Sequence, residues 1–115
     1  MPPFLKGVVK MFVVNGIEWN LSLAEPYSDN LKRSDNTFAL GVTDNNTKTI
    51  FINNRVSDAM FDKILCHELC HVASFSYNLH IDIQTEEIIA SFLSTYGREI
   101  FDIADDLLRR FMRVA

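Results

Sequence analysis

The sequence predicts an α+β domain in which an antiparallel sheet of about four strands, arranged as two hairpins, precedes two long helices. Two turn signals, Asn15-Gly16 and residues 44–47, each separate segments that are rich in β-branched and aromatic residues. Residues 57–77 contain neither Gly nor Pro, and apolar residues recur at helical spacing from residue 85 onward. We therefore expect the hairpins first and the helices second.

Length and composition limit the class of protein. The chain has 115 residues, which is enough for one domain with a modest core and too short for two. No apolar run reaches the roughly 18 residues that a membrane span needs. The net charge of -4 argues against nucleic acid as the main partner. We recognise no secretory signal, and two cysteines on adjacent helical turns make no disulfide framework, so we expect one domain, residues 1–115, in a reducing cytoplasm.

The first hairpin is predicted from residues 8–14 and 17–23. Asn15 and Gly16 stand between them, and both residues tolerate the positive φ that a two-residue hairpin turn requires. In the second strand apolar and polar residues alternate, so one face should meet the core. The residues expected on that face are Ile17, Trp19, Leu21 and Leu23.

The second hairpin is predicted from residues 37–43 and 48–53, after a polar loop over residues 25–36. Asp44-Asn45-Asn46-Thr47 supplies a four-residue turn between the two strands. The second of these strands leads directly into the first helix, so we expect Thr49–Asn53 to lie beside whatever site that helix carries. An exposed strand in such a place can pair with an extended peptide.

The first helix, over residues 57–77, carries the pattern His67-Glu68-x-x-His71. Ser57 is a good N-cap, and the apolar residues around the helix predict that it is buried on several sides. Two histidines four residues apart lie on adjacent turns of one face, so they can bind one Zn²⁺ through imidazole nitrogen. Glu68 lies beside them, where a carboxylate can take a proton from a water molecule.

Other interpretations of this helix are open. The histidines could be satisfied by ordinary hydrogen bonds, without a metal. Cys70 could join them in a structural Cys/His zinc site, although a cysteine on such a helix is more often a small core residue. His80, the remaining histidine, is expected in a linker over residues 77–84 as a surface residue or a neighbour of the site.

The second helix offers the missing third protein ligand of the zinc. Glu86 and Glu87 are the acidic residues at the right place, near the start of the helix, where acidic side chains also suit the helix dipole. A helical wheel points both toward the apolar side and leaves the choice open. The apolar stripe of this helix is expected to pack in the core: Ile89, Leu93, Tyr96, Ile100, Ile103, Ala104, Leu107, Leu108 and Phe111.

Over residues 49–100 the chain resembles the ImmA/IrrE-type metallopeptidases, above all the short members encoded by phages and prophages. The resemblance rests on His67-Glu68-Leu69-Cys70-His71 and on Glu-x-x-Ala-Ser-Phe-Leu-Ser some sixteen residues later. It implies a minimal gluzincin-like fold and makes Glu87 the third ligand, because Ala90, Ser91, Leu93 and Ser94 then match the family pattern. Cys70 and Ser91 depart from it, since Gly or Thr and Asn are usual there.

The resulting hypothesis is a zinc-dependent endopeptidase in which His67, His71 and Glu87 hold Zn²⁺ and Glu68 is the general base. Tyr96, Tyr77 and His80 are open candidates for a donor to the developing oxyanion. The resemblance implies a specific regulatory protein as substrate. The alternative is a non-catalytic zinc-binding module that binds a phage or host regulator. Oligomeric state is not predicted.

Overall fold

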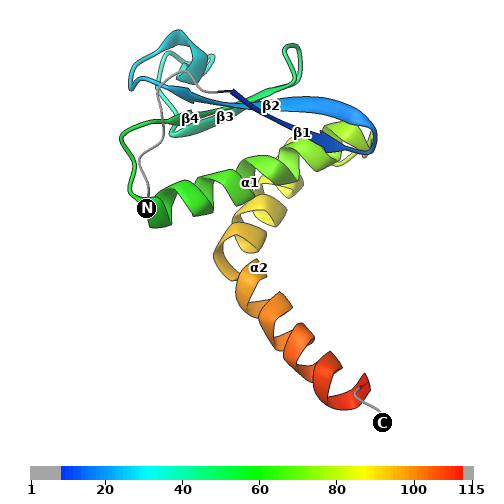
Figure 1. The fold of residues 1–115 in the computed structure, drawn as a ribbon. Helices are drawn as coiled ribbons and strands as arrows, with labels where there is room; N and C mark the ends of the chain where they lie inside the picture. Colours follow the sequence, from blue (N-terminus) through cyan, green and yellow to red (C-terminus); the bar gives the residue numbers. More distant parts are fainter. Residues whose placement is uncertain (1–8, 113–115) are drawn as a thin grey trace.

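The computed structural model describes residues 9–112, and the expected α+β architecture is confirmed. Two strands, β1 (Val9–Val14) and β2 (Ile17–Ala24), form the first hairpin. The residue Val8, predicted to begin β1, lies outside the described residues. A 3-10 turn, η1 (Asp29–Leu31), precedes the second hairpin of β3 (Gly41–Asp44) and β4 (Thr49–Asn53). The helices α1 (Asp58–Ser76) and α2 (Ile83–Met112) follow, so that sheet, α1 and α2 form successive layers (Figure 1).

The sheet has the order β1-β2-β4-β3 and is mixed, which corrects the expectation of an antiparallel sheet. Each hairpin is antiparallel, but the hairpins join through a parallel pair of β2 with β4, in which Leu21 lies opposite Ile50. The turns determine pairing only inside a hairpin. Pairing between hairpins follows burial, and β4 takes the central position because Ile50 and Ile52 are fully buried there.

This strand order contradicts the expectation that the strand Thr49–Asn53 is free to pair with a peptide. The strand β4, Thr49–Asn53, is paired on one side with β2 and on the other with β3, so it has no free edge. The strand β3 lies at the end of the sheet, and no described strand pairs with its other edge. It is shorter than predicted, because Ala39 and Arg33 use their backbone N–H groups in the loop around η1.

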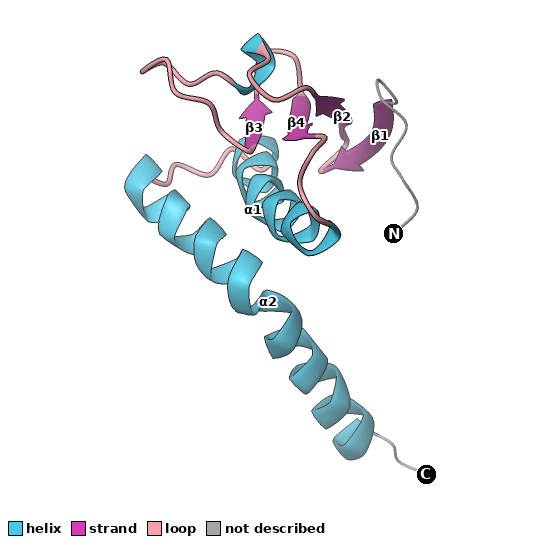
Figure 2. Ribbon diagram, turned by 90° about the vertical axis from the view of Figure 1, so that its left-hand side faces the viewer, coloured by secondary structure: helices cyan, strands magenta, loops and turns pink. Residues whose placement is uncertain are grey.

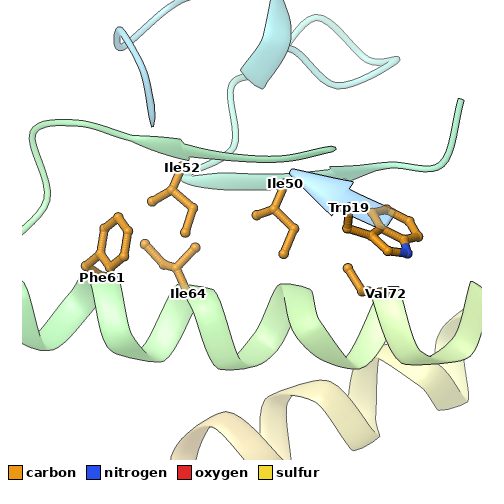
Figure 3. Packing of buried hydrophobic residues seen from close by; sticks show 6 residues of the cluster. All are labelled: Trp19, Ile50, Ile52, Phe61, Ile64 and Val72. Atoms are coloured by element: carbon orange, nitrogen blue, oxygen red, sulfur yellow. The ribbon is translucent and has the colours of Figure 1, made fainter. Parts of the chain in front are cut away.

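The core lies between the sheet and α1 (Figure 3). Trp19 is fully buried as predicted, and its indole Nε1 donates a hydrogen bond to Ser76 Oγ at 2.8 Å, at the end of α1. The other apolar residues of that face of β2 are partly buried against the same cluster. This packing fixes α1 under the sheet. The buried members of the cluster are Trp19, Ile50, Ile52, Phe61, Ile64 and Val72.

Both helices begin at identifiable caps. The side chain of Ser57 accepts a hydrogen bond from the backbone N–H of Met60, as expected for the start of α1. Asp82 accepts from the backbone N–H of Thr85, so α2 begins at Ile83, two residues earlier than predicted. Neither described helix is long and apolar enough to cross a membrane.

The apolar stripe of α2 is not a core stripe along its whole length, which corrects the expectation. The first half of α2 packs against α1 and buries Ala90 and Gly97. The second half extends past the rest of the molecule, and no described element lies beside it (Figure 2). Because α1 has 19 residues and α2 has 30, the shorter helix cannot cover the longer one.

Candidate metal centre

Three side chains predicted to hold a metal lie together in the structure. The Nε2 atom of His67 lies 3.2 Å from one carboxylate oxygen of Glu87, and the Nε2 atom of His71 lies 2.8 Å from the other. One ligand atom from each of the three residues lies within 4.8 Å of the others. A His-His-Glu group of metal-binding dimensions therefore joins α1 to the start of α2.

Helix geometry and packing together produce this arrangement. His67 and His71 stand one turn apart on α1, and their ring centroids are 5.2 Å apart. Glu87 stands in the first turn and a half of α2, where the small residue Ala90 is fully buried against α1 and lets the helices approach. His71 is almost completely buried, whereas Glu87 is half exposed. The group is thus open to solvent on the side of Glu87.

Glu86, the other candidate ligand, lies behind His71 instead of in the group. It is buried, and its Oε2 lies 2.5 Å from Nδ1 of His71. The hydroxyl of Ser74 donates to its other oxygen. With Nδ1 of His71 facing the Glu86 carboxylate, Nε2 is the ring nitrogen that faces Glu87 and could bind a metal. The adjacent acidic residues of α2 therefore have different surroundings, which a helical wheel could not distinguish.

Glu68 is held on the sheet side of α1. Its residue is 8% exposed, and Thr43 Oγ1 on β3 lies 2.8 Å from Glu68 Oε1 and 3.2 Å from its backbone carbonyl oxygen. Gly41, two residues before Thr43, allows this close approach of β3 to α1. A Cβ at Gly41 would lie 2.4 Å from Ile64 Cγ2 and 3.2 Å from Glu68 Cγ.

Sequence reasoning missed Thr43, Gly41 and Ser74 as neighbours of the site. Gly41 and Thr43 are two residues apart in the predicted strand, so they lie on the same face of it. This spacing indicates that both contact the same neighbouring element. Nothing in the sequence identifies that neighbour as the motif helix, because the contact depends on β3 taking the edge position. Ser74 follows His71 by three residues, on the same side of α1.

Two adjoining cavities lie along the group. One, of about 450 Å³, is lined by β3, His67 and His71 of α1, and Glu86 and Glu87 of α2. The other, of about 310 Å³, continues past Gly41 toward Ser91 and Ser94 of α2. Arg33, His67 and Glu68 line both cavities. Together they form an open trough between β3 and α2.

The three predicted oxyanion donors do not line this trough. Tyr77 caps the end of α1 and is exposed, and Tyr96 is half exposed with its ring against Phe92. His80 lies exposed between the helices. None of the three is among the described residues that line the two cavities. The described cationic side chain common to both cavities is Arg33, which the sequence analysis did not single out.

Cys70 is not a member of the His-His-Glu group. Burial raises the pKa of its thiol, and the neighbouring Cys66, Glu86 and Glu68 raise it further. A metal binds the thiolate form, so these surroundings disfavour coordination by Cys70. Its half-buried position in the helix fits the expectation of a small core residue.

The comparisons with known proteins add no family to this description. Neither protein-family models, nor curated proteins, nor solved structures gave a match.

Proposed function

We propose that the chain is a zinc-dependent endopeptidase, as its resemblance to the ImmA/IrrE-type metallopeptidases implies. The observation that carries the proposal is the meeting of His67 Nε2 and His71 Nε2 at the carboxylate of Glu87. Glu68 comes from the same helix and lines the same trough, at the position of a general base. Thr43 holds Glu68, and Glu86, itself held by Ser74, contacts His71.

Zinc suits this donor set. Two imidazoles and one carboxylate are the ligands of a catalytic zinc site that keeps a further position for water. Zinc–nitrogen bonds of about 2.0–2.1 Å at tetrahedral angles place ligand atoms about 3.3 Å apart, close to the His–Glu distances found here. Three carboxylates, Glu68, Glu86 and Glu87, converge without a described Lys or Arg in an ion pair with any of them. A divalent cation would offset their repulsion.

Glu68 is suited to move a proton. Bound zinc would polarise the peptide carbonyl and lower the pKa of a water toward 7. The hydroxyl of Thr43 holds Glu68 Oε1, which leaves Oε2 to accept a proton from the attacking water. The same carboxyl group then hands that proton to the leaving amine. Arg33 lines both cavities, and we propose that its guanidinium group donates a hydrogen bond to the developing oxyanion.

The free edge of β3 is suited to hold an extended peptide beside the group. The carbonyl oxygen of Leu40 accepts from the N–H of Asn53, so Leu40 faces β4. Successive residues of an antiparallel pair alternate in direction, so the N–H and C=O groups of Gly41 and Thr43 point away from β4. A substrate strand would add there, within the trough that Glu68 and His67 line. The proposed substrate is a regulatory protein that offers such an extended segment.

The experiment that tests this function uses a mixture of amine-blocked peptides from a digested proteome. Zinc-loaded protein, zinc-stripped protein and stripped protein reloaded with zinc are each incubated with the mixture, and new N-termini are counted by mass spectrometry. We expect cleavage at a restricted set of sites in the loaded and reloaded samples only. Tight zinc binding without any new N-terminus would favour the non-catalytic zinc-binding module.

Replacing Glu86 by Gln should weaken zinc binding without removing a ligand. The amide cannot match the negative charge that Glu86 presents to His71 Nδ1, and losing such a partner typically costs about 10–100-fold in metal affinity. Competition titration against a chromophoric chelator measures this change. Glu18→Gln, on the exposed side of β2, is the control and should leave affinity unchanged. Equal affinities of both variants would remove Glu86 from the metal centre.

Replacing Gly41 by Ala should destabilise the fold at the contact of β3 with α1. The new methyl group would meet Ile64 at 2.4 Å, and overpacking of this kind costs about 1–3 kcal/mol. Urea unfolding of the metal-free protein measures the free energy of unfolding. Met11→Ala, at an exposed position of β1, should change it by less than about 0.5 kcal/mol. A stability of Gly41→Ala equal to the parent would contradict the close approach.

A further inference from the structure

The second half of α2, residues 98–112, is the largest feature that the site does not use. Its start still contacts α1 through the ion pair of Arg98 with Asp62, and from there it extends alone beyond the sheet and α1 (Figure 1). Every residue in it is exposed. The radius of gyration is 16.1 Å, whereas a compact chain of this length has about 13 Å. Even so, this segment carries large apolar side chains, with Ile103 53% and Phe111 80% exposed.

These apolar side chains form one stripe. Leu93, Tyr96, Ile100, Ile103 and Leu107 follow one another at alternating intervals of three and four residues, which is the spacing of a helix that packs along a second helix. We call the part beyond α1 the distal stripe. It consists of Ile100, Ile103, Leu107 and Phe111.

We propose that a second copy of this chain covers the distal stripe, with the two α2 helices antiparallel. In the register that pairs Ile103 of one copy with Leu107 of the other, Ile100 meets Phe111, and the symmetry repeats both contacts. Every position of the distal stripe then has an apolar partner. In this register the helix of one copy ends level with Arg98 of the other, and Arg98 meets α1 on a side of α2 about 140° from Ile103.

The charges of the segment fit the antiparallel direction. Acidic residues occupy its first part and basic residues its end, so antiparallel copies bring opposite charges together at both ends, whereas parallel copies would align like charges. In the register above, Glu99 of one copy lies beside Arg110 of the other, next to the stripe, where it adds to the pair that Arg110 forms with Asp106 of its own helix. The acidic residues are Glu99, Asp102, Asp105 and Asp106, and the basic ones at the end are Arg109 and Arg110; Arg98, at the start, is paired with Asp62 on α1.

This dimer would leave the candidate metal centre open. Ile103 follows Glu87 by sixteen residues, which turns it about 160° around the helix axis and moves it about 24 Å along the axis. The stripe and the trough therefore lie on different sides of α2. The dimer is independent of the proposed peptidase activity, and either proposal can fail without the other.

Sedimentation velocity of the full chain, over a range of concentrations up to about 100 μM, tests the proposal directly. We expect a reversible dimer. Ile103→Glu combined with Leu107→Glu should give a monomer, because each copy would then bury two charges, four in the dimer, against apolar surface. Met112→Glu, which adds the same charge on the opposite side of the helix at an exposed position, is the matched control and should remain a dimer. Unchanged circular dichroism and zinc affinity would show that the double variant is folded.

Charge exchange tests the direction of the helices. Glu99→Arg and Arg110→Glu should each raise the dissociation constant about 3–10-fold, and the two changes in one chain should restore it. Restoration is expected only when residue 99 of one copy meets residue 110 of the other. A parent protein that stays monomeric, or a dimer that survives the double Glu substitution in the stripe, would overturn the proposal. Failure of the exchange to restore the dimer would overturn the antiparallel register.

Discussion

Glu68→Gln is expected to abolish peptide cleavage while zinc remains bound. The amide has nearly the same shape as the carboxylate, and its carbonyl oxygen can still accept the hydrogen bond from Thr43. It cannot take a proton from water, and loss of a general base typically slows a reaction about 10²–10⁴-fold. The loss of cleavage rate is measured under single-turnover conditions, with one identified peptide as substrate and mass spectrometry to detect its products.

Two further measurements make this result specific to the base. Zinc content should stay at that of the parent, because Glu68 is outside the His-His-Glu group. Glu18→Gln should cleave at the parental rate, since Glu18 is exposed on β2, away from the trough. If Glu68→Gln cleaves as fast as the parent, another group takes the proton and our assignment of the base is wrong.

Glu87→Gln is expected to have the largest effect on zinc itself. The substitution removes the negative charge of the carboxylate that contacts both imidazole nitrogens. Its zinc affinity should fall by more than the roughly 10–100-fold that is typical for a residue behind a ligand. Activity should disappear with the metal, and both should return only in part at high zinc concentration. Competition titration and elemental analysis measure the two quantities.

The matched comparison for this variant is Glu86→Gln, one residue earlier on the same helix. Because Glu87 is half exposed and Glu86 is buried between His71 and Ser74, the two substitutions remove equal charges from different surroundings. We expect the order of zinc affinity to be parent, then Glu86→Gln, then Glu87→Gln. The reverse order would mean that Glu86 is the ligand and that the side chains rearrange when the metal binds.

Local sequence patterns were sufficient to predict the strands and helices, and the part of the site that lies on α1. Asn15-Gly16 and residues 44–47 predict turns because their backbone preferences act within a few residues. Ser57 and the run without Gly or Pro predict α1, and the spacing of His67 and His71 places both on one face of it. These inferences succeed because each depends only on neighbours along the chain.

Contacts between distant segments were beyond such patterns. The expected peptide-binding strand, Thr49–Asn53, lies inside the sheet, because Ile50 and Ile52 are buried most completely between β2 and β3. The stripe of α2 looks like a core stripe on a helical wheel, but α1 ends before it can cover Ile103 and Leu107. A periodic pattern indicates that an apolar face needs a partner and does not say whether that partner belongs to the same chain.

The sequence by itself determined that two imidazoles and Glu68 share one helix, since helical spacing depends on nothing outside α1. Only the tertiary structure decided which acidic residue of α2 meets both imidazoles. The packing of Ala90 against α1 directs Glu87 toward Nε2 of both histidines and Glu86 toward Nδ1 of His71. The physical reason is that consecutive residues of a helix differ by about 100° in direction, so the rotation of α2 against α1 assigns their different roles.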